Sequence, residues 1–422
     1  MALPTTDEDA GVLRFITAGS VDDGKSTLIG RLLFDSKGLL RDQVAAISKS
    51  RAGSNEEAEI DLALVTDGLE SEREQGITID VAYRYFATPR RSFIIADAPG
   101  HEQYTRNMVT AASNAEAAVI LIDASRLAGK GLKAQTRRHA TIAKLMGLKV
   151  IVAVNKMDLT GWSRAVFEEI RDNFARVART LGIEDPIYVP IAAKHGDNVA
   201  RRTPHTPWYD GPPLLEILET LDATRRNDGV FRLPVQRVIR MPDGARAYAG
   251  RIASGDVAVG QEITVLPSGQ TAVVEAIRTF DGAFADAAEG QSVGVVLDRD
   301  VDVSRGDTLA SAEARTTRAL VADLCWLDEE PWEKGRRYLL KQGSRTTQAL
   351  IDGIVFVREM TELAEVGEAS GLKLNDIASV KVKLRDPILA DTYAERPATG
   401  AFVLIDAASN QTAAAGMIRE AA

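Results

Sequence analysis

The sequence predicts a mostly parallel α/β domain with helices on both faces of its sheet, followed by two β-barrel domains. Up to about residue 222, short apolar runs alternate with ten or more residues of helical or mixed pattern. This is the order of elements that a parallel sheet requires. Beyond residue 229, short strand-like runs are set off by Gly, Asp and Pro, which is typical of β-barrels.

The first domain begins with the apolar run 12–18, which stops at Gly19. A Gly-containing loop and a helical pattern over residues 25–34 follow, so strand, loop and helix come in the order of a βαβ unit. A helix over residues 214–221 is expected to close the domain. The expected strands of this domain cover residues 12–18, 93–96, 116–122, 149–154 and 187–191.

The stretch 203–213 is dense in Pro and Gly, and the hydrophobic pattern changes after it. We therefore divide the chain into domains over residues 1–228, 229–313 and 314–422. The pair Trp208 and Tyr209 is expected to pack at a domain boundary rather than to bind a partner. Expected strands of the barrels cover residues 231–239, 247–253, 261–266, 271–279, 292–297 and 308–310, and then 319–326, 336–342, 345–357, 374–384 and 400–406.

Composition and charge exclude several classes of protein. The 422 residues carry a net charge of −9, of which −3 falls on residues 1–228 and −6 on residues 229–422. Domains that bind nucleic acid phosphates are usually basic, so non-specific nucleic acid binding is disfavoured. The apolar runs are shorter than the roughly 18 residues that cross a bilayer, and we expect no secretory signal. With the single cysteine Cys325 expected as a buried apolar side chain, no internal disulfide can form and a cytoplasmic location fits.

The strongest motif is GSVDDGKS at residues 19–26, a match to GxxxxGK[ST] between an expected strand and an expected helix. Its glycines let backbone N–H groups wrap phosphate oxygens at a helix N-terminus. Lys25 is expected between the β- and γ-phosphates, and the Ser26 hydroxyl on Mg²⁺. The residues expected to bind phosphate are Gly19, Ser20, Val21, Asp22, Asp23, Gly24, Lys25, Ser26, Thr27 and, from a later loop, Gly100.

Two loops further along the chain favour GTP over ATP. Asp97 begins DAPGH at a strand end, where its carboxylate can hold a Mg²⁺-bound water and the Gly100 N–H can approach the γ-phosphate. Asp158 ends NKMD after a later strand, and its carboxylate can accept both the N1–H and the N2 amino hydrogen of guanine. Adenine has no such donor pair. The residues expected beside guanine are Asn155, Lys156, Asp158, Ala192, Ala193 and Lys194.

Thr78, in GITID, lies between the P-loop and Asp97, where a switch loop would bring its hydroxyl to Mg²⁺ and the γ-phosphate. We expect Ser26, Thr78 and Asp97 to hold Mg²⁺. The gap of 52 positions between Ser26 and Thr78 is longer than a minimal switch requires. It is either a solvated helical insertion or a nucleotide-sensitive segment that contacts a partner.

In this order, VDDGKST, EREQGITID, DAPGH, QTRRH and NKMD resemble the motifs of translation-factor-type GTPases of the elongation factor Tu class. The resemblance covers essentially the whole chain, because such proteins follow the GTPase domain, here residues 1–228, with two β-barrels. Within this class the chain is most similar to the large, GTP-hydrolysing subunits of sulfate adenylyltransferase (ATP sulfurylase). That similarity is carried by GKSTLIGRLLFDSK, by TDGLESEREQGITIDVAYRYF, and by GDNV followed by TPWY.

The resemblance implies roles for individual residues. His101 matches the histidine that positions the attacking water, and Val21 and Ile77 match the apolar pair that limits its approach. Lys25, Thr78 and His101 are then the catalytic residues. No arginine finger is obvious, so we expect slow intrinsic hydrolysis that rises when a partner orders the switches.

The chain departs from the family pattern at two places. Ala192-Ala193-Lys194 stands where the family usually has Ser-Ala-Lys or Ser-Ala-Leu. The Ala193 N–H can still reach guanine O6, but the bracing hydroxyl is missing, so modestly weaker guanine affinity is expected. Ala98 stands where Thr is common, and little effect is expected there.

The resemblance implies that GTP hydrolysis drives formation of adenylylsulfate and diphosphate from ATP and sulfate. The sequence contains no second P-loop, no SGGxDS-type loop and no HxGH motif. We therefore expect a small catalytic subunit to handle ATP and sulfate, in a heterodimer or larger assembly without membrane or nucleic acid. The alternative is an elongation factor-type GTPase that delivers aminoacyl-tRNA. The VAYRYF continuation of the switch favours the first function.

Overall fold

The computed structural model describes residues 11–36, 80–127, 131–223, 229–241, 244–279, 282–367 and 369–421. The chain folds into two compact units, Met1–Thr224 with Glu359–Ala364 and Arg225–Arg358 with Glu365–Ala422. Among the described helices, none is long and apolar enough to cross a membrane.

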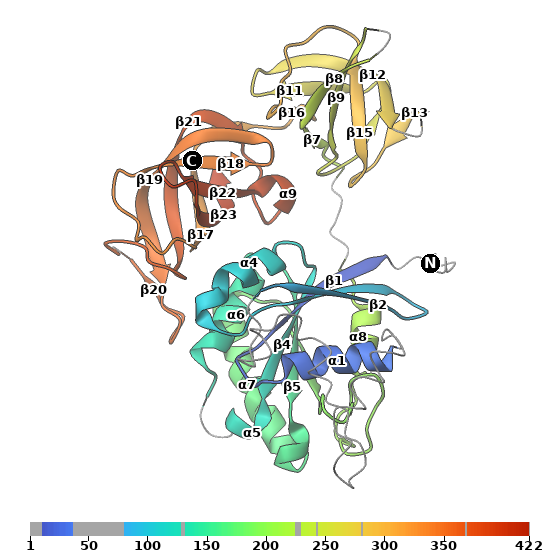
Figure 1. Cartoon of the computed structure of the whole chain (residues 1–422), viewed down its shortest axis with the longest axis vertical. Coiled ribbons are helices and arrows are strands. Elements are labelled where there is room, and N and C mark those ends of the chain that lie inside the picture. The colour runs from blue at the N-terminus through green and yellow to red at the C-terminus, as the bar shows by residue number, and fades with distance from the viewer. Residues whose placement is uncertain are drawn as a thin grey trace. The chain divides into compact units, whose positions relative to one another are not determined.

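The first unit is built on a six-stranded sheet (Figure 1). Its strands, in spatial order, are β2 (Ala82–Ala87), β3 (Ser92–Asp97), β1 (Val12–Ala18), β4 (Ala117–Asp123), β5 (Lys149–Asn155) and β6 (Ile187–Pro190). All neighbours pair in parallel except β2, which runs antiparallel to β3. The predicted mostly parallel sheet is confirmed. Sequence reasoning missed β2, because only Phe86 of its six residues is buried and no apolar run marks it.

Helices cover both faces of this sheet. Along β4 the side chains of Ala117, Val119 and Leu121 share one core with α1 and α8. The alternate residues of β4 are equally buried, so the opposite face is covered too, and α6 contacts β4 and β5. The helices are α1 (Lys25–Asp35), α4 (Thr105–Ala112), α5 (Ala124–Leu127), α6 (Ala134–Leu145), α7 (Arg164–Leu181) and α8 (Leu214–Thr220), with the 3₁₀ turns η2 (Glu102–Tyr104) and η3 (Met157–Thr160).

The Trp208 and Tyr209 pair packs inside the first unit. The Trp208 ring lies 5.3 Å from that of Phe167 on α7, and its Nε1 donates to the Trp162 carbonyl. The Tyr209 hydroxyl donates to the carbonyls of Tyr188 and Pro212. The two side chains pack, as predicted, but inside the first unit, and a place at a domain boundary stays a prediction.

The first barrel of the second unit is an open half-barrel. Its main ladder runs, in spatial order, through β7 (Arg232–Pro234), β16 (Thr308–Ala310), β11 (Glu262–Leu266), β12 (Gln270–Thr279), β15 (Ser292–Leu297), β9 (Arg246–Arg251) and β8 (Arg237–Arg240). β13 (Gly282–Phe284) pairs with β12, and β10 (Val257–Ala258) pairs with β14 (Asp286–Ala287). The single strand expected over residues 231–239 is divided between β7 and β8, because β7 pairs with β16 whereas β8 pairs with β9.

The second barrel closes, because β18 pairs with strands on both of its sides. The closed ring runs through β18 (Arg337–Gln342), β22 (Ala401–Asp406), β23 (Thr412–Ala421), β17 (Thr316–Trp326), β21 (Ile377–Leu389) and β19 (Arg345–Arg358), with β20 (Glu365–Val366) beside β19 and a short α9 (Pro397–Gly400) before β22. Sequence reasoning missed β23, whose run of small alanines has little β-propensity. Cys325 is buried in β17, as predicted. The boundaries at residues 228 and 313 stay predictions.

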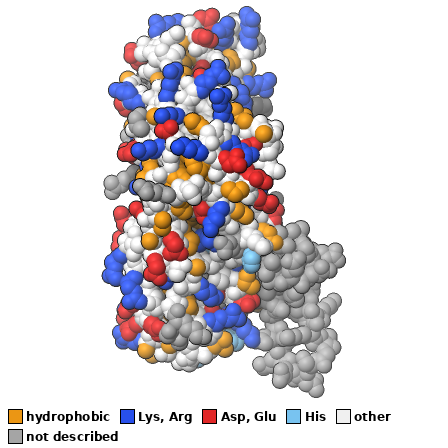
Figure 2. Space-filling model, turned by 90° about the vertical axis from the view of Figure 1, so that its left-hand side faces the viewer, with side chains coloured by type: hydrophobic (Ala, Val, Ile, Leu, Met, Phe, Trp, Pro, Cys, Tyr) orange, Lys and Arg blue, Asp and Glu red, His pale blue; other side chains and the backbone are white. Residues whose placement is uncertain are grey.

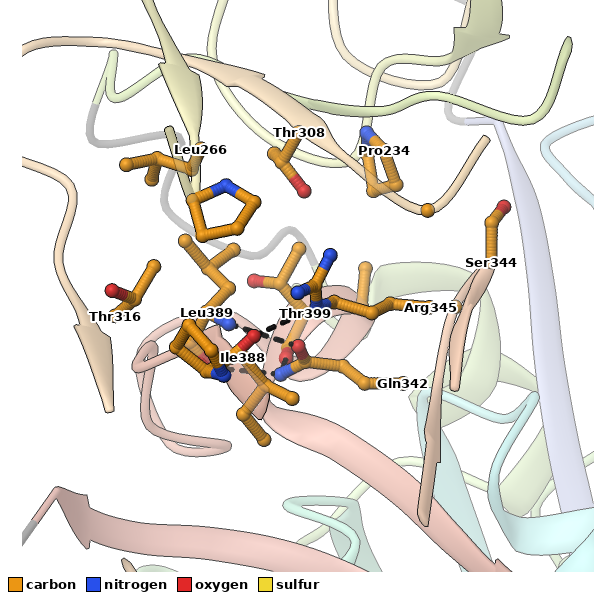
Figure 3. Close-up of a pocket in the computed structure, with 15 residues that line it drawn as sticks. Pro234, Leu266, Thr308, Thr316, Gln342, Ser344, Arg345, Ile388, Leu389 and Thr399 are labelled. Carbon is orange, nitrogen blue, oxygen red and sulfur yellow. Dashed lines mark hydrogen bonds between the residues drawn. The ribbon is translucent and has the colours of Figure 1, made fainter. Parts of the chain in front are cut away.

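A buried ion-pair network joins the two barrels. Arg232 on β7 is 2% exposed, and its guanidinium donates to both carboxylate oxygens of Asp391 at 3.1 and 3.2 Å. Asp391 also accepts from the Thr399 hydroxyl at 2.7 Å and pairs with Arg396 at 3.3 Å. In the neighbouring cleft, residues of both barrels face one another (Figure 3), and Gln342 donates to the carbonyls of Leu389 and Thr399.

Replacing Arg232 with alanine is expected to lower the free energy of unfolding by about 3 kcal/mol, because it leaves the buried Asp391 carboxylate without its main partner. Chemical denaturation of the full chain measures this. The control is Arg237→Ala on the exposed strand β8, where a change within about 0.5 kcal/mol is expected. Equal stability of the two variants would contradict the prediction.

Candidate functional site

The P-loop connects β1 to α1 at the carboxyl end of the sheet. Gly24 caps α1 with a φ of 96°, a backbone conformation that favours glycine. The Asp23 N–H donates to the Ser20 carbonyl at 3.2 Å, and the Ser20 N–H donates to Asp23 Oδ2 at 2.7 Å. The Ser20 hydroxyl is buried and has no hydrogen-bond partner among the described residues. An orphaned polar atom in a closed Gly-rich loop is typical of a site shaped for a ligand.

Lys25 is buried and turns back over the loop. Its Nζ donates to the carbonyls of Gly19 at 3.0 Å and Ser20 at 3.4 Å. Burial lowers the pKa of Lys25, although nearby carboxylates, first that of Asp97, favour its charged form. Because this ammonium is poorly solvated, an arriving phosphate oxygen would give it a strong partner.

The loop after β3 lies directly against the P-loop. Asp97 is the last residue of β3, and its Oδ1 accepts from the Thr17 hydroxyl on β1 at 3.1 Å. A Cβ added to Gly100 would lie 2.5 Å from both the Gly19 carbonyl oxygen and Lys25 Nζ. The structure therefore brings together Lys25, Asp97 and Gly100, which lie far apart in the sequence.

Replacing Gly100 with alanine is expected to slow GTP hydrolysis about 10²-fold, because the added methyl group displaces Lys25 or the P-loop backbone. Steady-state hydrolysis by the purified chain measures this. Gly353→Ala is a matched control, since a Cβ there meets nothing within 4 Å and its backbone has no positive φ. Wild-type turnover by the Gly100 variant would contradict the close approach seen here.

The oxygen donors at this end of the site suit Mg²⁺. Ser26 is the second residue of α1, and the Asp97 carboxylate is oriented by Thr17. Mg²⁺ prefers oxygen ligands and is usually held by one or two side chains together with substrate phosphates. Among the described residues, no group of three or more His, Cys, Asp or Glu side chains could hold a metal ion. Thr78, Ile77 and the long insertion before them lie outside the described residues.

At the guanine end, Asn155 ties two loops together. Its Nδ2 donates to the Asp23 carbonyl at 2.9 Å, and its Oδ1 accepts from the Ala193 N–H at 3.0 Å. The Ala193 N–H is thus already donated to Asn155, and its approach to guanine O6 stays a prediction. Asn155 is only 2% exposed, and its buried carbonyl needs that donor. Asn155 and Ala193 brace the P-loop against the loop that follows β6.

Lys156 also connects the loop after β5 to the P-loop, and it pairs with Asp123, a residue that sequence reasoning missed. Its Nζ donates to the Asp22 carbonyl at 2.6 Å and to Asp123 Oδ2 at 2.8 Å. Burial alone would raise the pKa of Asp123, but hydrogen bonds from Lys156 and Ser125 lower it below the ordinary value. Asp123 ends β4 as Asp97 ends β3, so the same signal, a carboxylate directly after an apolar run, could have identified it.

Asp158 lies in η3 with 24% of its side chain exposed. Its Oδ2 is 3.6 Å from Nε2 of His195, a residue to which sequence reasoning gave no role. Ala192 is buried at the start of the same loop. Asn155 and Lys156 thus connect neighbouring loops, whereas the Asp158 carboxylate remains partly exposed.

Comparison with known proteins agrees with this geometry. A model of the elongation factor Tu GTP binding domain matches residues 11–227, and a model of the GTP-eEF1A C-terminal domain-like family matches residues 319–419. Sulfate adenylyltransferase subunit 1 of Aliarcobacter butzleri is 47% identical over 418 residues, which cover 98% of this chain and 88% of that protein. The subunit 1 of Shewanella oneidensis is 48% identical over 97% of this chain and 85% of that protein.

The chain belongs to the sulfate adenylyltransferase subunit 1 family. A Mycobacterium tuberculosis protein named bifunctional enzyme CysN/CysC is also 48% identical, over 96% of this chain and 67% of that protein. Membership of the sulfate adenylyltransferase subunit 1 family and the matched GTP-binding domain confirm the function predicted from the motifs, a GTPase subunit of sulfate adenylyltransferase. The roles of individual residues stay predictions.

Two histidines, His101 and His139, differ in their exposure to solvent. His101 is exposed just before η2, and its Nδ1 accepts from the Gln103 N–H at 3.3 Å, so the neutral ring carries its proton on Nε2. His139 on α6 is fully buried, and burial together with the Lys25 and Arg138 charges lowers its pKa to about 3. Of the two, only His101 is exposed and could reach a water at the γ-phosphate.

Proposed function

We propose that this chain hydrolyses GTP and that the hydrolysis drives formation of adenylylsulfate and diphosphate from ATP and sulfate in a smaller catalytic subunit. The observation that carries the GTPase part is the contact of Gly100 with both Gly19 and Lys25, which joins a switch-type loop to the P-loop. The site lies at the carboxyl ends of parallel strands, where α/β sheets bind their ligands. Family membership supports the sulfate-activating part.

In this proposal the protein positions the reactants and stabilises charge. Lys25 and the N–H groups of the P-loop hold the β- and γ-phosphates, and Asp158 accepts the two guanine donors. Ser26, Asp97 and Thr78 would hold Mg²⁺, which when bound neutralises charge on the phosphates. His101 holds the attacking water with its Nε2–H.

The smaller subunit is proposed for the chemistry on ATP and sulfate, because the sequence carries one P-loop motif and no second nucleotide-binding motif. A cytoplasmic location belongs to the same proposal, since a single cysteine fits a reducing compartment. The alternative, delivery of aminoacyl-tRNA, would favour a basic stripe on the barrel surface. On the face shown in Figure 2, acidic side chains lie among the basic ones.

The test is GTP hydrolysis by the purified chain, alone and with the small subunit, in the presence and absence of ATP and sulfate. Stimulation that requires the small subunit and both of its substrates is expected. Stimulation by ribosomes, or a shift of the chain by tRNA at low salt, would support the translation alternative and leave the GTPase function standing. Absence of hydrolysis under every condition would contradict both.

A further inference from the structure

The loop after β6 places an imidazole beside the carboxylate proposed to select guanine. His195 Nε2 lies 3.6 Å from Asp158 Oδ2, an ion-pair distance only slightly longer than a hydrogen bond. Half of the His195 side chain and a quarter of the Asp158 side chain are exposed, so a small rotation of the ring can shorten this contact. In the described part of the chain, no other side chain is paired with the Asp158 carboxylate.

Backbone hydrogen bonds fix the position of His195 in the loop. Its N–H and that of Gly196 both donate to the Ala192 carbonyl, at 3.1 and 2.8 Å, which closes a tight turn. Gly196 has a φ of 85°, and a Cβ added there would lie 2.5 Å from Nε of Arg31. Because this turn is packed against α1, His195 is held next to η3.

His195 also lines a hollow, and half of its side chain is exposed, so the ring has room to rotate. Basic and acidic side chains both line this hollow, and none of these described residues forms an ion pair with the imidazole in competition with Asp158. The charged residues are Arg31, Asp35, Asp197, Arg201 and Arg202. Arg31 is already paired with Asp35 at 3.1 Å, and Arg202 donates to the Asp210 carbonyl at 2.8 Å.

We infer that His195 orients the Asp158 carboxylate for guanine by donating its Nε2–H to one carboxylate oxygen. Ala192, the buried residue at the start of the turn, has no hydroxyl and cannot supply this hydrogen bond. A carboxylate offers about four lone-pair sites, so Asp158 can accept from the imidazole and from both guanine donors together. His195 is then a positioning residue that acts through Asp158, and the inference rests on the guanine site proposed above.

The test is a double-mutant cycle on GDP affinity, measured by calorimetry with the full chain. His195→Ala is expected to weaken GDP binding about tenfold, the loss of one hydrogen bond to a charged group. His195→Gln, whose amide can donate to the same oxygen, is expected to bind within about twofold of wild type. In the Asp158→Ala background, His195→Ala is expected to change affinity by less than about twofold, because its target is gone.

An unchanged GDP affinity in His195→Ala would overturn the inference. So would an equal loss in the wild-type and Asp158→Ala backgrounds, because that loss would come from the loop and not through Asp158. The proposed guanine site is tested separately by Asp158→Ala alone. If that variant keeps its preference for GDP over ADP, the guanine site is wrong whatever His195 does.

Discussion

Replacing Lys25 with alanine is expected to abolish GTP hydrolysis, with a loss of at least about 10³-fold, and with it any GTP-dependent sulfate activation. Lys25 is buried, its ammonium already contacts two P-loop carbonyls, and no other lysine makes these contacts among the described residues. The substitution removes the charge that would meet the transferring phosphate and also leaves a space in the floor of the loop.

Single-turnover hydrolysis of GTP, followed with and without the small subunit, measures the effect. Lys149→Ala is the matched control, because Lys149 is an exposed lysine at the start of β5 and should be replaceable without loss. If the Lys25 variant hydrolyses GTP at more than about a tenth of the wild-type rate, Lys25 does not have the proposed role.

Replacing His101 with alanine is expected to leave GTP affinity within about twofold and to slow hydrolysis about 10²-fold to 10³-fold. His101 is exposed, and its imidazole makes no hydrogen bond to the P-loop in the described structure, so we expect phosphate binding not to depend on it. Its Nε2–H is available to hold a water. Removing a group that acts only when the water attacks lowers the rate of hydrolysis without lowering ground-state affinity.

GTP affinity and single-turnover rate, measured on the same preparation, separate the two effects. His205→Ala is the matched control, since this exposed histidine stacks on Trp162 and has no proposed role. Unchanged turnover in the His101 variant would remove this residue from the mechanism. Loss of binding in parallel with turnover would place it in the binding site instead.

The two variants together distinguish how GTP drives sulfate activation. Lys25→Ala removes the phosphate contact, whereas His101→Ala is expected to leave a GTP-bound chain that turns over slowly. If binding alone promoted adenylylsulfate formation, the His101 variant would keep the stimulation. If hydrolysis is required, as proposed, both variants lose it.

Secondary structure was predicted well where one face of an element is apolar and poorly where it is not. β4 is buried along its whole length and stands out in the sequence. β2 is an edge strand with Tyr83 40% exposed and Tyr85 67% exposed, and β23 is a strand of small residues inside a closed barrel. β2 is held by its pairing with β3, and β23 by its pairing inside the closed barrel. Neither strand therefore needs a strong hydrophobic pattern of its own.

The sequence by itself determined the P-loop, the aspartate after β3, the guanine motif and the order of an α/β domain before two barrels. These are local features, because a phosphate-binding loop needs its glycines, lysine and hydroxyl in adjacent positions of one chain. Only the tertiary structure decided which side chains hold these motifs in place. Asn155 reaches Asp23 across 132 positions and Arg232 reaches Asp391 across 159, while His195 meets Asp158 through a turn after β6. Such contacts depend on which segments the strand order and the packing of the barrels bring together, and no local pattern records that arrangement.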